Sequence, residues 1–268
     1  MTAFVLKMIA LTAMIIDHIG AAFPGYAPFE FRIIGRLTFP IFVFLLAEGF
    51  RHTRSPMKFL LRLFAFAIIS EPFFDWAITR THLTYGYNPW RVDFLNNTNI
   101  FYTLFLGGVA IVAFQWIARY LTQRFSGDSP EEPVIPHHYS THLPQRVAIY
   151  SFAALPTIGF MWIAEILGTD YGGYGVLFIF LMYVIKSPKW LVLMVLTVMN
   201  VFQHRGLWPF FIGEIPIPIG FYLMIPATLL TVPLIAMYNQ QRGPSLKWLF
   251  YIVYPAHLAV LAGLAFLF

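Results

Sequence analysis

The stretch LKMIALTAMIIDHIG, residues 6–20, is an apolar run that carries two adjacent titratable side chains, Asp17 and His18, well inside it. In a spanning helix, an ionisable side chain is costly unless it faces a cavity or a partner. Lys7 precedes His18 by eleven residues, which is about 16 to 17 Å along a helix. The stretch therefore predicts a membrane-spanning helix with a polar site built into it.

The composition of the whole chain excludes a water-soluble protein. Of 268 residues, 59% are hydrophobic and 11% are charged, whereas soluble proteins have about a quarter of their residues charged. The basic residues lie in clusters between apolar runs and not along one face, so nucleic acid is not an expected partner. The chain has no cysteine, which excludes disulfides, thiolate metal sites and a cysteine nucleophile.

Apolar runs of about 18 residues or more predict spanning helices. We expect such helices at residues 4–23, 33–51, 57–78, 98–120, 147–167, 219–238 and 248–268, with shorter ones at 174–185 and 189–203. The proline-rich segment 207–219 is expected to be a re-entrant segment or a broken tenth helix. The sequence thus predicts an all-α integral membrane protein, a polytopic helical bundle of about nine or ten transmembrane helices. A single membrane domain is expected over residues 1–268.

The distribution of Lys and Arg predicts how the chain lies in the lipid bilayer. Basic connections favour the cytoplasmic side, which indicates a cytoplasmic N-terminus. With nine spans the C-terminus is expected outside the cell membrane, and with ten spans it is expected on the cytoplasmic side. The hydrophilic connection 121–146 is expected to be a cytoplasmic loop and a linker. Its histidines lack carboxylates at ligand spacing, so no metal site is expected.

The first three predicted spans bring further charged residues to the depth of Asp17. Arg32 and Arg36 lie four residues apart and share a helix face, and Glu71 and Asp75 do the same on the third span. We therefore expect a polar pocket below the outer surface. In the alternative, these groups form buried ion pairs, such as Asp17 with Arg36, that fix helix packing.

His18 is the best candidate for proton transfer in this pocket. Imidazole takes and returns a proton near neutral pH, and Glu71 or Asp75 is expected to set its tautomer. Adjacent helical residues diverge by about 100°, so Asp17 and His18 need partners on different helices.

A basic cluster marks the predicted cytoplasmic end. Glu48 reaches Arg51 and His52 along the second span, and Lys7 emerges on the same side. Further basic residues follow at Arg54, Lys58 and Arg62. Such a cluster is explained by the positive-inside rule and anionic lipid, or by a phosphate site for a nucleotide-like ligand from the cytosol.

Two other polar residues remain within predicted spans. His257, in FYIVYPAHLAV, is either a satisfied histidine at a helix kink or a second polar group lining the pocket. Asn99, near the start of the fourth span, caps that helix or reaches a substrate amide.

Taken together, LKMIALTAMIIDHIG, RIIGRLTFPIFVFLLAEGFRHTRS, LLRLFAFAIISEPFFDWA and KWLFYIVYPAHL resemble the TraX family of bacterial membrane proteins. The resemblance implies a multi-span acetyltransferase of the bacterial inner membrane that acetylates the N-terminus of a pilin. The family is wider than conjugation systems, so the acceptor stays open. The chain is also distantly similar to membrane acyltransferases that modify sugars. Lys7 and His18 have the spacing of their basic residue and histidine, with Lys where Arg is commoner.

These observations predict a membrane-bound acyltransferase that moves an acetyl group from cytoplasmic acetyl-CoA to an amine or hydroxyl near the outer leaflet. The acceptor is a peptide, such as a pilin N-terminus, or a glycan. The alternatives are a proton-coupled small-molecule transporter and an assembly factor with buried ion pairs. We expect catalytic roles for His18, Asp17, Arg36, Glu71 and Asp75, cofactor binding by Lys7, Glu48, Arg51, His52, Arg54 and Lys58, and a substrate pocket with Arg32, Asn99 and His257.

In the expected reaction, His18 is the general base and Arg36 stabilises the oxyanion. Direct transfer and an acetyl-histidine intermediate both stay open.

Overall fold

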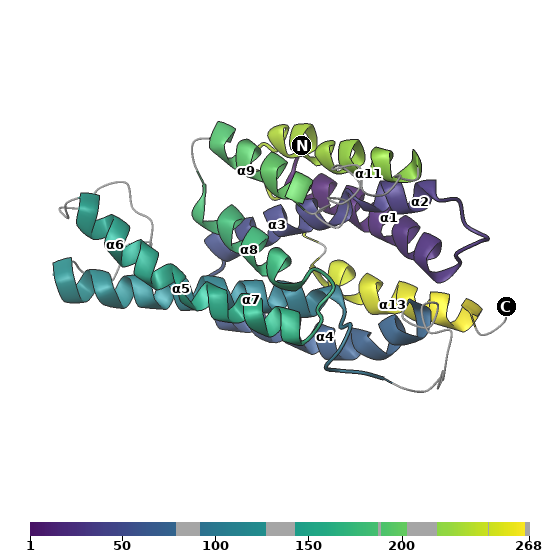
Figure 1. The fold of residues 1–268 in the computed structure, drawn as a ribbon, viewed down its shortest axis with the longest axis horizontal. Helices are drawn as coiled ribbons and strands as arrows, with labels where there is room; N and C mark the ends of the chain where they lie inside the picture. The colour runs from purple at the N-terminus through teal and green to yellow at the C-terminus, as the bar shows by residue number, and fades with distance from the viewer. Residues whose placement is uncertain (79–91, 127–142, 187–188, 203–218, 246, 266–268) are drawn as a thin grey trace, which may run out of the picture.

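A computed structural model describes residues 1–78, 92–126, 143–186, 189–202, 219–245 and 247–265. These residues are helical apart from short connections, and they contain no strand (Figure 1). The helices are α1 Ala3–Ala22, α2 Glu30–Gly35, α3 Thr38–His52, α4 Pro56–Ala77, α5 Ile100–Ser126, α6 Leu143–Ala154, α7 Pro156–Ile166, α8 Gly172–Val184, α9 Lys189–Phe202, α11 Ile219–Leu229, α12 Thr231–Ala236 and α13 Lys247–Ala265. The predicted all-α class is confirmed.

Several helices are suited to a bilayer, as in a multi-pass membrane protein. Within the described residues, five segments are long and apolar enough to cross a membrane: 3–22, 30–52, 100–125, 144–166 and 248–265. Shorter apolar helices lie at 172–184, 190–200 and 223–236. The five long segments do not confirm the predicted nine or ten crossings. Helix α4 is not among the five because Lys58, Arg62, Glu71 and Asp75 make it more polar.

Three predicted spans are not continuous helices, and a proline accounts for each break. Proline has no N–H for the carbonyl four residues earlier, and its ring clashes with that carbonyl. Pro40 follows the turn between α2 and α3, Pro156 begins α7 directly after α6, and Pro233 follows the break between α11 and α12. The predicted spans 33–51, 147–167 and 219–238 therefore lie where helices are found, but each prediction missed the break within the span.

The predicted loop 121–146 is shorter than expected at both ends. Helix α5 continues to Ser126 and α6 begins at Leu143. Residues 127–142 and the segment 207–218 lie outside the described part of the chain.

The helices are arranged around a buried centre formed by α3 and α8. Helices α9 and α11 lie along one side of the molecule, and α4, α5, α7 and α13 lie along the other (Figure 1). Helix α1 packs against α2, α3 and α13. Fully buried side chains at this centre include Phe39 and Ile41 on α3 and Phe178 and Ile179 on α8.

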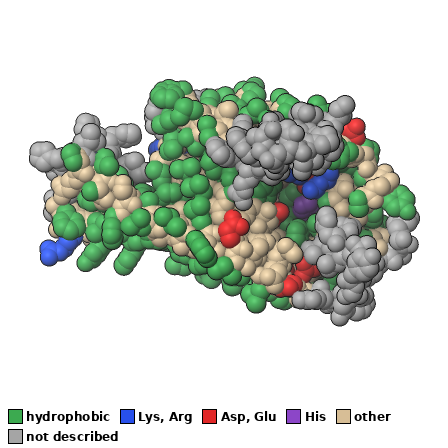
Figure 2. Space-filling model, viewed as in Figure 1, with side chains coloured by type: hydrophobic (Ala, Val, Ile, Leu, Met, Phe, Trp, Pro, Cys, Tyr) green, Lys and Arg blue, Asp and Glu red, His purple; other side chains and the backbone are tan. Residues whose placement is uncertain are grey.

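The outward surface is strongly apolar. Hydrophobic side chains cover most of the described part of the face in Figure 2. Large hydrophobic side chains that are exposed on the surface of the molecule include Trp116, Trp162, Trp190 and Val260. Such a surface suits contact with lipid, because the hydrocarbon core of a bilayer offers no hydrogen bonds to polar side chains.

Asp17 joins α1 to α2. Its carboxylate forms ion pairs with Arg32 at 2.8 Å and with Arg36 at 3.5 Å, and Arg32 also donates to the Asp17 carbonyl at 3.2 Å. The predicted Asp17–Arg36 pair is present, although Arg32 is the closer partner. Gly35 makes this approach possible, since a Cβ atom at this position would overlap the Asp17 side chain.

We expect Gly35→Ala to destabilise the protein by about 1–3 kcal/mol, because the added methyl group must displace the Asp17 side chain from its partly buried ion pairs. Thermal unfolding of the purified protein in detergent measures this as a lower Tm. Gly263→Ala is the matched control, since a Cβ atom there meets nothing within 4 Å in helix α13. Equal melting temperatures for the two variants would contradict the packing argument.

Candidate functional site

One cavity of about 830 Å3 runs through the bundle between α1, α3, α4, α5 and α13. At the end where α1 begins, four cations line it, and we call these the cationic mouth: Lys7, Arg54, Arg62 and Arg242. At the other end it is lined by Asp17, His18, Asp170, Tyr171 and Tyr254, which we call the histidine end. A single space thus joins the two sites that the sequence predicts separately.

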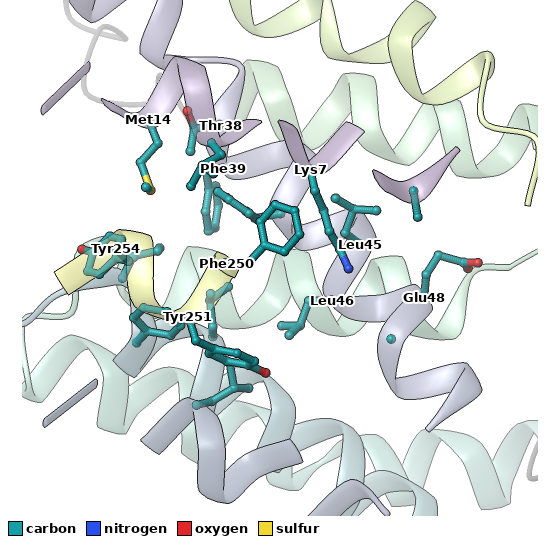
Figure 3. Close-up of a pocket in the computed structure, with 18 of the residues that line it drawn as sticks. Lys7, Met14, Thr38, Phe39, Leu45, Leu46, Glu48, Phe250, Tyr251 and Tyr254 are labelled. Carbon is teal, nitrogen blue, oxygen red and sulfur yellow. The ribbon is translucent and has the colours of Figure 1, made fainter. Parts of the chain in front are cut away.

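The middle of the cavity is apolar. Leu11, Leu45 and Leu46 line it together with aromatic rings such as Phe250. Figure 3 shows Lys7 reaching into this space beside Phe250, with Glu48 toward one end of the view and Tyr254 toward the other. The Lys7 ammonium lies 5.3 Å from the centre of the Phe250 ring, a cation–π distance. The walls therefore suit a flexible chain with a charged end.

His18 has a histidine partner at the histidine end. Its Nδ1 lies 2.7 Å from Nε2 of His257, and Nδ1 of His257 lies 2.7 Å from the Val253 carbonyl oxygen. The two imidazoles are nearly parallel, with centres 5.0 Å apart, and the Tyr254 ring packs edge-on against both. The group that orients His18 is therefore His257, and not Glu71 or Asp75 as predicted. His257 is not among the residues that line the cavity, and it lies behind His18 as its hydrogen-bond partner.

Glu71 and Asn99 hold α4 to the start of α5, and Asp75 holds α4 to the connection that precedes α5. Glu71 accepts hydrogen bonds from the Asn99 backbone N–H at 3.1 Å and from its side chain at 2.6 Å. Asn99 Oδ1 accepts from the Phe101 N–H, which is the capping role that the sequence left open. Asp75 accepts from the Asp93 N–H at 2.7 Å. None of the three is among the residues that line the cavity, and these hydrogen bonds join α4 to the segment 93–101.

Arg32 and Arg36 also lie behind the cavity wall. Both guanidinium groups bind Asp17, and Nε of Arg36 donates to the Arg32 carbonyl at 3.1 Å. Of this group, Asp17 lines the cavity and the two arginines do not. The ion-pair alternative thus describes their geometry better than the predicted oxyanion or substrate contacts.

The predicted cofactor residues divide into two groups. Lys7, Glu48, His52 and Arg54 line the cavity, whereas Lys58 is exposed on α4 and does not. Glu48 is engaged by Arg51 and lies 3.6 Å from His52.

The Arg51 side chain caps the C-terminal end of α8. It donates to the carbonyls of Met182, Tyr183 and Ile185, at 2.8 Å for Tyr183. These carbonyls have no helical donor of their own, and a cation there also interacts favourably with the helix dipole. Arg51 does not line the cavity, so its predicted phosphate contact is replaced by this structural role.

Sequence reasoning did not assign Arg242 to the site. The segment 239–242 binds the start of α1 through backbone hydrogen bonds: Ala3 N–H donates to Gln241 O at 2.8 Å and Phe4 N–H to Arg242 O at 3.1 Å. Gly243 has φ +70°, a conformation that favours glycine, and a Cβ atom there would crowd Thr2 and Phe4. The polar run NQQRGPS was the available signal, but it indicated only a connection on the cytoplasmic side.

Asp170 and Tyr171 were also missed. They occupy the short connection between α7 and α8, where the Asp170 N–H donates to the Thr98 carbonyl at 3.0 Å. The Asp170 side chain is exposed to the cavity, yet desolvation by the surrounding protein raises its pKa to about 6, with the Asp17 carboxylate adding to the rise. Asp170 is therefore mostly ionised at neutral pH and offers a carboxylate to the histidine end.

The described residues contain no group of three or more His, Cys, Asp or Glu side chains placed to hold a metal ion. Within the same residues, no carboxylate forms an ion pair with a cation of the mouth. The chemistry available at the site is therefore that of an anion-binding mouth and a histidine, connected by an apolar passage.

Comparison with known proteins places the chain in a family. A relative, described as a probable fimbrial assembly protein FimC, serogroup H1, from Dichelobacter nodosus, is 36% identical over 114 residues, which are 41% of this chain. The match covers 46% of that protein, so it spans about half of the relative's length. No solved structure matches the chain. The model of the family described as TraX protein matches residues 3–265, nearly the whole chain, and the protein therefore belongs to the TraX family.

Proposed function

We propose that the protein is an acetyltransferase that moves the acetyl group of acetyl-CoA to an amine or hydroxyl acceptor. The observation that carries the proposal is the single cavity that connects the cationic mouth to His18. The mouth lies on the side that the positive-inside rule makes cytoplasmic, so the acyl donor enters from the cytosol of a bacterial cell. The acceptor then meets it toward the outer leaflet of the inner membrane.

The donor fits the cavity in three parts. Its phosphates suit the cationic mouth, since guanidinium groups bind phosphate with paired N–H donors. The uncharged pantetheine arm suits the apolar middle. Lys7 and His18 are eleven residues apart on α1, or about 16 to 17 Å, a length that the arm can cover. The thioester then lies near His18.

In the reaction, the acceptor N–H or O–H attacks the thioester carbonyl and His18 takes its proton. The carbon–sulfur bond breaks, a carbon–nitrogen or carbon–oxygen bond forms, and the proton returns to the leaving thiolate. The hydroxyl of Tyr171, a residue that lines the histidine end, replaces Arg36 as the candidate donor to the oxyanion. Direct transfer and an acetyl-histidine intermediate use the same base.

The acceptor class is suggested by the relatives. The fimbrial assembly protein from D. nodosus and the family resemblance both favour a pilin, whose N-terminal amine is the acceptor, over a glycan hydroxyl. A proton-coupled transporter is less well supported. Glu71 is bound by Asn99 at the start of α5, Asp75 is bound by Asp93 in the connection before α5, and neither lines the passage that His18 faces.

The first test is acetyl-CoA binding and turnover by purified protein. Titration calorimetry in detergent should detect acetyl-CoA, with much weaker binding of acetyl-pantetheine, because this analogue lacks the nucleotide and its phosphates. His18→Ala should keep the binding and lower acetyl transfer to pilin peptide or glycan by about 10²–10⁴-fold, the range for loss of a general base. Absence of binding by folded protein would reject the acetyltransferase and leave transport or assembly.

Charge removal at the mouth gives the second test. Arg54→Gln and Arg242→Gln should each weaken acetyl-CoA binding by about tenfold or more, since a hydrogen bond to a charged group contributes about 1.5–3 kcal/mol. Lys58→Gln is the matched control, because Lys58 is exposed on α4 outside the cavity. Equal affinities for all three variants would place the phosphates elsewhere.

The Arg51 side chain provides a contrast with Arg54, three residues away. Arg51→Gln should lower the Tm, because the last carbonyls of α8 lose their donor. Arg54→Gln should leave the Tm unchanged. If Arg51→Gln selectively weakens acetyl-CoA binding without lowering the Tm, its assignment as a helix cap is wrong.

A further inference from the structure

The hydrogen bond between His18 and His257 determines where the protons on both rings lie. A backbone carbonyl oxygen accepts hydrogen bonds and cannot donate them. His257 Nδ1, 2.7 Å from the Val253 carbonyl oxygen, must therefore carry a hydrogen. In a neutral His257, Nε2 is then unprotonated and acts as an acceptor. His18 must donate to it from Nδ1 across the 2.7 Å contact, which leaves the lone pair of His18 on Nε2.

The surroundings favour two neutral rings. Within the described residues, neither histidine forms an ion pair with a carboxylate, and Asp17 on the same helix is engaged by Arg32 and Arg36. An imidazolium at this place would have none of the described carboxylates in direct ion-pair contact, which is costly inside a helix bundle. The edge-on Tyr254 ring packs against both imidazoles and restricts their rotation.

We propose that His257 is a positioning residue that holds His18 in its Nδ1–H tautomer and so makes Nε2 the basic nitrogen. This inference rests on the proposed function, because it specifies which atom of His18 takes the acceptor's proton. During transfer, Nε2 receives that proton while Nδ1–H stays bonded to His257. Nε2 then returns the proton to the thiolate, and the original tautomer is restored. A single nitrogen thus serves both steps without ring rotation.

Two substitutions separate positioning from packing. His257→Gln keeps an acceptor oxygen near the place of Nε2, whereas His257→Phe keeps an aromatic ring of similar size and has no acceptor. We expect the Phe variant to lower kcat about 10²-fold or more, with little change in KM for acetyl-CoA, and the Gln variant to recover part of this loss. If the Phe variant is as active as the Gln variant or more active, the ring's volume is what matters and the proposal is overturned.

The tautomer itself can be measured without enzyme activity. Protein labelled with 15N at histidine and reconstituted in lipid reports which ring nitrogens carry hydrogen, and the His18 signals are those lost in His18→Gln. The proposal requires hydrogen on Nδ1 of His18 and a bare Nε2, and the opposite pattern overturns it. This measurement uses the wild-type chain, so it remains decisive if His257→Phe fails to fold. If wild-type protein shows this tautomer but neither binds nor uses acetyl-CoA, the proposed function fails and the assignment of the protons stands.

Discussion

Asp17 and His18 are consecutive residues on a membrane helix, and helix geometry turns their side chains about 100° apart. Lipid supplies no hydrogen bonds, so each side chain needs its own partner within the protein. Asp17 finds Arg32 and Arg36 on the α2 side, and His18 finds His257 on α13. Helix α1 is thereby held from two directions. The rest of the site depends on this arrangement, because it fixes both the depth of His18 and the direction in which it faces the cavity.

The same helix also sets the length of the cavity. Lys7 lies near the beginning of α1 and His18 near its end, so a rigid element separates the cationic mouth from the His18 imidazole by about 16 to 17 Å. The connection before α13 binds the start of α1 through its backbone and adds Arg242 to the mouth. The far end is completed by the connection between α7 and α8. Distant parts of the chain thus supply the two ends, while α1 provides the distance between them.

The sequence predicted what helical spacing alone can determine. The shared depth of Asp17 and Arg36, the separation of Lys7 from His18 and the possible capping role of Asn99 all follow from positions within single helices or between neighbouring ones. It could not predict partners chosen by tertiary packing. His18 and His257 are 239 positions apart, and Arg51 turns to α8 whereas Arg54 faces the cavity. The local sequence around these residues is compatible with several partners. Which partner each side chain meets is decided only when the helices pack. The helix breaks at Pro40, Pro156 and Pro233 were missed because hydropathy, which identified the spans, is averaged over a whole segment and does not register a local break.

A histidine partner differs from the carboxylate that was expected for His18. A carboxylate fixes the tautomer of an imidazole and also stabilises its protonated form, but in a helix bundle it brings a charge that must itself be compensated. Neutral His257 fixes the tautomer through one hydrogen bond and is satisfied in turn by a backbone carbonyl of its own helix. Glu71, one of the two acids that were expected to orient His18, is held instead by the polar start of α5. The protein therefore keeps the hydrogen-bond partner of His18 separate from the buried acid on α4, and that partner brings no charge of its own when it is neutral.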